Sequence, residues 1–192
     1  MKKINSAIDR FCYQHPRFGI PNLMLWVVIG NVIVYVMDMM SRGTFSAMLS
    51  FVPAYIFQGQ IWRLVTFVLV PNYGSNFFFF AISAYFYYFI GSRLENQWGT
   101  ARFNFFYCSG IVLAIVVGLL EGLIGGGMAV TSTMEYNNLS LFFAFASLFP
   151  DMTVLLFFII PVKVKWLAYL DAAWLLYGVV SLLLKGAYIS AL

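Results

Sequence analysis

Charged and polar residues inside long apolar segments are the residues of this chain that could do chemistry. A charged side chain in a bilayer is costly unless it is paired or reaches water, so each one is a candidate functional residue. The candidates are Trp62, Arg63, Gly91, Glu95, Gly99 and Arg102. Arginine and glutamate form strong hydrogen bonds and glycines let helices approach closely, so these residues could bind a ligand or brace a fold.

Trp62 and Arg63 end an apolar segment that is broken by proline, glutamine and glycine. The pair suits a loop in the membrane interface, with the indole at headgroup level and the guanidinium donating to backbone carbonyls. Alternatively, Arg63 extends its apolar stem and places its charge in water. The spacing leaves both interpretations open.

Gly91, Glu95 and Gly99 recur every four residues, which places them on one face of a helix. Glycines at this spacing form the small-xxx-small pattern of packed membrane helices. Glu95 could accept hydrogen bonds from a neighbouring loop, or pair with Arg93 or Arg102. Alternatively, the group is a solvated helix end.

The composition indicates a helical membrane protein that crosses the bilayer several times. Of the 192 residues, 62% are hydrophobic and 9% are charged, where a soluble domain carries about 25% charged residues. The net charge of +4 is scattered, which argues against a nucleic-acid partner. Cys12 and Cys108 show no disulfide or metal-ligand spacing, and no phosphate loop, metal-ligand cluster or cofactor motif is present, so no metal or cofactor is expected.

The apolar runs predict five membrane spans and one broken segment. The predicted spans are 20–40, 77–94, 103–123, 138–149 and 166–184. The region 44–71 is expected to form short embedded helices and loop, which membrane depth tolerates only where protein or water covers the backbone. The fourth span, at roughly 18 Å, is short for a bilayer. The apolar piece 152–160 is too short to cross and is expected at the interface.

Positive charges predict a cytoplasmic N-terminus. Three groups then lie inside: Lys2, Lys3, Arg10 and Arg17; Arg93 and Arg102; Lys163 and Lys165. Arg42 and Arg63 are exceptions in the outer first loop.

The Trp62-Arg63 pair and the Gly91, Glu95, Gly99 series resemble motifs of the rhomboid superfamily, which includes intramembrane serine proteases and inactive derlin-like relatives. The resemblance covers roughly residues 20–184. It implies that the pair lies in a half-embedded outer loop and that the glycine–glutamate element holds the fold together. It also implies an all-α, rhomboid-like bundle, here with five spans and a sixth either absent or beyond the end of the chain.

The catalytic residues of rhomboid proteases have no counterpart in this chain. The family uses a serine in a Gly-x-Ser-Gly motif and a histidine that acts as its base, and this motif is missing. Ser109-Gly110 matches part of it but lies in the third span, where a small pair serves helix packing. His15 precedes the first span, and nothing places Lys185 beside Ser140. Ser140 is therefore only a weak nucleophile candidate.

Two polar features remain. Asp171 in the last span is either a proton or substrate site or, as we favour, a partner of Lys163, Lys165 or water. Asn137, Asn138 and Ser140 form either a polar helix cap or a patch that binds a client helix.

These features lead to one functional hypothesis and two alternatives. We expect a cytoplasmic segment, 1–19, and a transmembrane domain, 20–192, in a plasma membrane of the bacterial type. The expected function is that of a proteolytically inactive, derlin-like protein that binds transmembrane segments of other proteins, with lipid and those helices as partners. The alternatives are an active intramembrane serine protease that uses Ser140 and, with less support, a small-solute transporter or channel component.

Overall fold

The computed structural model describes residues 10, 14, 18–71, 76–124, 133–156 and 160–184. Most of the predicted segment 1–19 lies outside this part, including Cys12 and His15. Lys185 also lies outside it. The chain forms two compact units, Met1–Leu139 and Ser140–Leu192, whose boundary falls within helix α8.

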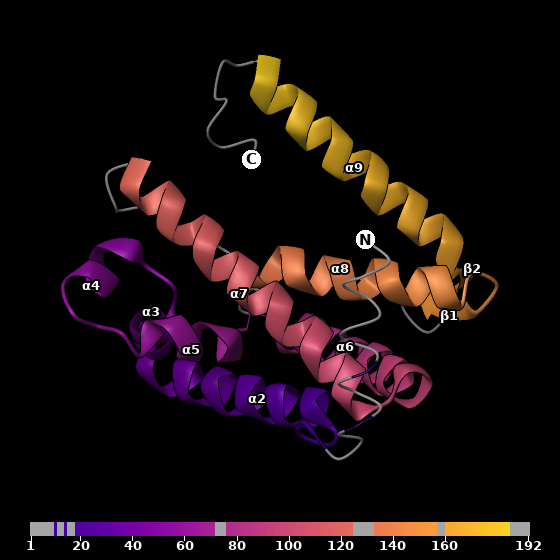
Figure 1. The fold of residues 1–192 in the computed structure, drawn as a ribbon, viewed down its shortest axis with the longest axis horizontal. Coiled ribbons are helices and arrows are strands. Elements are labelled where there is room, and N and C mark those ends of the chain that lie inside the picture. The colour runs from indigo at the N-terminus through magenta and orange to yellow at the C-terminus, as the bar shows by residue number, and fades with distance from the viewer. Residues whose placement is uncertain are drawn as a thin grey trace. The chain divides into compact units, whose positions relative to one another are not determined.

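Three helices of the first unit are long and apolar enough to cross a membrane: α2 (Leu23–Ser41), α6 (Phe77–Trp98) and α7 (Thr100–Ile124) (Figure 1). They correspond to the first three predicted spans. The short helix α8 (Thr133–Leu148) and the helix α9 (Val164–Leu184) coincide with the fourth and fifth. The apolar part of α8 is Asn137–Leu148. The membrane crossing of these last two helices stays a prediction.

The segment between α2 and α6 is broken into short pieces, as predicted from its proline, glycine and glutamine residues. They are α3 (Thr44–Leu49), α4 (Pro53–Phe57), α5 (Arg63–Thr66) and the 3₁₀ helix η1 (Phe67–Leu69). Pro53 occupies the first position of α4, where its missing N–H leaves no bond unmade. In Figure 1 the helices α3 and α5 lie beside α2, and α4 lies farther from it. The helix α2 contacts α3 and η1, and α4 contacts α7.

Side chains from this broken segment pack onto glycines of the long helices. Phe51 and Pro53 lie against Gly118 and Gly122 of α7, so closely that a Cβ at either glycine would collide with them. Phe51 also meets the edge of Phe67 at 5.4 Å between ring centroids. The small residues of α7 therefore provide the surface on which the segment is seated.

The connection between α6 and α7 is much tighter than the loop expected between residues 94 and 103. The helix α6 continues to Trp98, α7 begins at Thr100, and Gly99 alone separates them. Gly99 has φ 84° and ψ 154°, a backbone conformation that residues with a Cβ rarely adopt.

The described residues are mostly helical, in agreement with the expected all-α class, but one segment of the second unit forms two short strands. The piece predicted as an interfacial apolar stretch contributes to an antiparallel β-hairpin of β1 (Thr153–Leu156) and β2 (Ile160–Lys163). Thr153 pairs with Lys163 and Leu155 with Pro161. Valine, isoleucine and threonine favour extended backbone, and a proline is tolerated because a two-stranded sheet consists only of edge strands.

Candidate functional site

Arg63 holds the turn that follows α3. Its side chain is buried at 5% exposure, and its Nη1 donates to the carbonyl oxygens of Ala47 at 2.8 Å and Ser50 at 2.7 Å. Its Nε donates to Oε1 of Gln60 at 2.7 Å, and the guanidinium lies 4.9 Å from the Tyr55 ring centroid. Arg63 therefore acts as a brace within the broken segment, and its burial argues against the alternative in which its charge extends into water. Trp62 beside it is exposed.

Glu95 connects the segment that precedes α2 to the junction of α6 and α7 through hydrogen bonds. Its side chain, at 8% exposure, accepts hydrogen bonds from the backbone N–H of Asn22 at 2.9 Å and from Thr100 Oγ1 at 3.0 Å. The structure thus shows the loop contact, which was one of the three interpretations of Glu95. Arg93 lies over the ring of Phe89, and Arg102 is exposed at the start of α7.

Asn104 forms a second set of hydrogen bonds between α7 and the segment that precedes α2, and this set was not predicted from the sequence. Its Oδ1 accepts from the Ile20 N–H at 3.0 Å, and its Nδ2 donates to the carbonyls of Ile20 at 3.0 Å and Thr100 at 2.8 Å. Asn104 is buried. The only available signal was an amide four residues after Thr100 in an otherwise apolar run.

Gly91 and Gly99 have different structural roles, although their spacing suggested one shared packing face. A Cβ on Gly91 would collide with Met24 of α2, so this glycine permits a close helix contact. Nothing lies within 4 Å of a Cβ built on Gly99, where the backbone conformation is what requires glycine.

The polar stretch of α8 presents its three side chains to different surroundings. Asn137 is buried at 4% exposure and packs against Gly110 of α7, so tightly that a Cβ there would collide with its Oδ1. Asn138 is half-buried and Ser140 is exposed. Because α8 begins five residues before the predicted start, Ser140 lies about two turns inside the helix. Of the predicted packing pair Ser109-Gly110, Gly110 packs as expected, whereas Ser109 is exposed.

The two candidate bases for Ser140, His15 and Lys185, lie outside the described residues, so the structure tests neither pairing. Among the residues that the structure describes, no three His, Cys, Asp or Glu side chains gather as metal ligands do.

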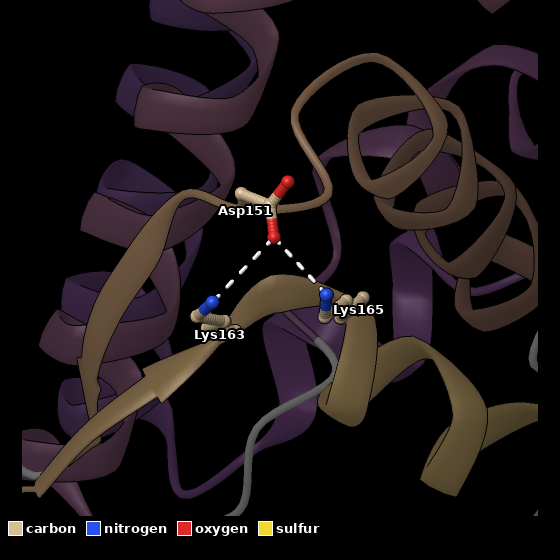
Figure 2. Close-up of polar contacts among 3 residues, drawn as sticks. All are labelled: Asp151, Lys163 and Lys165. Carbon is tan, nitrogen blue, oxygen red and sulfur yellow. Dashed lines mark hydrogen bonds and ion pairs between the residues drawn. The ribbon is translucent and has the colours of Figure 1, made fainter.

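Lys163 and Lys165 bind Asp151, which corrects the expectation that one of these lysines pairs with Asp171. Water as the partner of Asp171 stays a prediction. Figure 2 shows the Asp151 carboxylate between the two ammonium groups, with Oδ1 at 3.0 Å from Lys165 Nζ and 3.6 Å from Lys163 Nζ. The Lys165 hydrogen bond and the two positive charges lower the pKa of Asp151. The hairpin register brings Lys163 opposite Thr153, close to Asp151, whereas Asp171 lies two turns along α9.

Comparisons with known proteins identify a family for this chain. The family described as eukaryotic integral membrane protein (DUF1751) matches residues 22–191. No curated protein and no solved structure shows significant similarity to the chain. The eukaryotic description gives no support to a bacterial-type plasma membrane, while the particular membrane and the N-terminal orientation stay predictions. Since the match covers most of its length and its apolar helices are of membrane-spanning size, the chain belongs to this family of integral membrane proteins and contacts membrane lipid.

Proposed function

We propose that the chain is a proteolytically inactive, rhomboid-like membrane protein that binds transmembrane segments of client proteins. The observation that carries the proposal is the polar start of a short apolar helix. Asn137–Leu148 contains twelve residues, about 18 Å of helix, where the hydrocarbon core is about 30 Å thick. A helix this short favours a locally thinned bilayer or polar groups at membrane depth.

The exposure of Ser140 supports a binding role for this helix. Asn137 packs on Gly110, and Ser140 is exposed on the same helix. A hydroxyl at membrane depth can hydrogen-bond a polar group of another helix, at a modest gain of about 0.6 kcal/mol. Weak, reversible capture of a client helix that carries a polar residue fits this chemistry.

The framework residues support a binding role over a catalytic one. Arg63 and Glu95 direct their described hydrogen bonds to backbone and side-chain groups of the fold. They are therefore explained by architecture alone. The chain also has no Gly-x-Ser-Gly motif, the element that carries the nucleophilic serine of rhomboid proteases.

Site-specific photo-crosslinking tests the proposal. A photo-reactive amino acid at Ser140 or Asn138, in the full chain in native membranes, is expected to trap membrane proteins. The same amino acid at Leu113, an exposed residue of α7, is the matched control and is expected to recover lipid alone. Recovery of lipid alone from Ser140 and Asn138 would refute client binding at this helix.

A further inference from the structure

A small cavity lies inside the first unit, between helices that are distant in sequence. Its volume is about 20 Å³, and residues of α2, α6, α7 and α8 and the chain around η1 line it. The lining residues that matter here are Asn31, Tyr87, Tyr107, Met134 and Asn138. No charged side chain is among the residues that line it, so it offers no counter-charge to an ion.

Two buried polar atoms belong to residues that line this cavity. The Tyr107 side chain is 1% exposed, and its hydroxyl has no hydrogen-bond partner within the described part of the chain. The same holds for the buried Oδ1 of Asn31. Leaving a buried donor or acceptor unpaired raises the unfolding equilibrium constant by on the order of tenfold or more, so buried groups of this kind are nearly always satisfied.

We propose that this cavity is a binding site for one water molecule, which joins Tyr107 of α7 to Asn31 of α2. A cavity holds a water when it offers roughly 10–15 Å³ and two to four polar partners, and this one meets both conditions. The water donates to Asn31 Oδ1 and accepts from, or donates to, the Tyr107 hydroxyl.

Asn138 is a third polar residue of the cavity lining. The bound water therefore couples α2 to α7 through hydrogen bonds and lies beside residues of α8. Polar groups within membrane helices face the protein interior or a wet cavity for the same reason. The inference stands on the cavity and its polar lining and does not depend on client binding.

Solid-state NMR on the full chain in lipid bilayers tests the inference directly. With tyrosine labelled at the phenolic carbon, magnetisation is transferred from water to the rings, and Tyr107→Phe identifies the Tyr107 signal. We expect rapid transfer to Tyr107 despite its burial. Tyr35, which is also buried but stacks on Phe80 at 4.1 Å and does not line the cavity, is the internal control and is expected to be slow. Equal, slow transfer to both rings would overturn the proposal.

A double-mutant cycle gives the second readout. Tyr107→Phe and Asn31→Leu are each expected to raise the unfolding equilibrium constant on the order of tenfold. The double variant is expected to fall well short of the product of the two effects, because the partners of one water are lost together. Tyr85→Phe, at an exposed tyrosine, is the control and is expected to be neutral. Multiplicative effects would contradict a shared water, and the NMR measurement decides the matter if a variant does not fold.

Discussion

Replacing Arg63 with lysine keeps the positive charge but removes the planar fork of donors that holds the turn after α3. The wild-type guanidinium donates to Ala47, Ser50 and Gln60 from two different nitrogens. An ammonium is a single compact donor centre and cannot reproduce this geometry. We expect the lysine side chain of the Arg63→Lys variant, with its single nitrogen, to keep one of the three hydrogen bonds.

The magnitude follows from the two bonds that are lost. A hydrogen bond to a charged group contributes about 1.5 kcal/mol or more, so the free energy of unfolding should fall by about 3 kcal/mol. That change corresponds to an increase of roughly 150-fold in the unfolding equilibrium constant. Arg63→Met loses all three hydrogen bonds and the contact with Tyr55, so it should lower the free energy of unfolding further.

The assay is reversible unfolding of the purified chain in mixed micelles, followed by circular dichroism as the denaturing detergent is increased. Arg42→Lys is the matched control, because Arg42 is exposed and follows α2, and it should change stability by less than about 0.5 kcal/mol. If Arg63→Lys is as stable as this control, the hydrogen bonds of Arg63 do not support the fold and the reasoning fails.

Three further predictions concern other contacts. Glu95→Leu should lower the free energy of unfolding by about 2 kcal/mol because it removes both hydrogen bonds that Glu95 accepts. Glu95→Gln should lower it by less, because its amide oxygen can still accept a hydrogen bond. Equal losses of stability in detergent unfolding would refute the acceptor role. Gly110→Val should cost about 1–3 kcal/mol by overpacking, whereas Gly178→Ala, where a Cβ meets nothing within 4 Å, should be neutral or stabilising in the same assay. Lys165→Met should raise the pKa of Asp151 toward its usual range in an NMR titration of the carboxyl carbon, since Lys165 is the main cause of its lowering. Because this pKa is lowered in the folded state, the ion pair stabilises the fold above the unfolded pKa, and this stabilisation is lost as the pH falls through the folded pKa. High salt should weaken the ion pair.

The three long helices and the broken segment could be predicted because their signals are local. Apolar runs of span length identify α2, α6 and α7, and Pro53 and Gly59, which interrupt 44–71, are poor helix formers. The hairpin could not be separated from an interfacial stretch by periodicity, because a short apolar run fits a strand and a helix equally well. The pairing of Asp151 with the two lysines depends on the hairpin register and was missed with it.

The polar contacts of the interior were harder to predict than the helices that position them. Arg63 and Glu95 stood out as charges in apolar segments, but their partners are mainly backbone groups that carry no sequence signal. Asn104, Asn31 and Tyr107 are single polar residues within apolar runs, and only the tertiary structure shows which groups surround them. Their roles follow from tertiary structure.

The most direct measurement of whether the chain binds clients or cleaves them is labelling of the purified protein in bilayers with a fluorophosphonate, a probe that reacts with activated serines. A catalytically active rhomboid serves as the positive control, and Ser140→Ala identifies any adduct at Ser140. We predict no adduct on this chain where the control is labelled. An adduct that disappears in Ser140→Ala would show an activated nucleophile and would contradict the assignment as an inactive, client-binding protein.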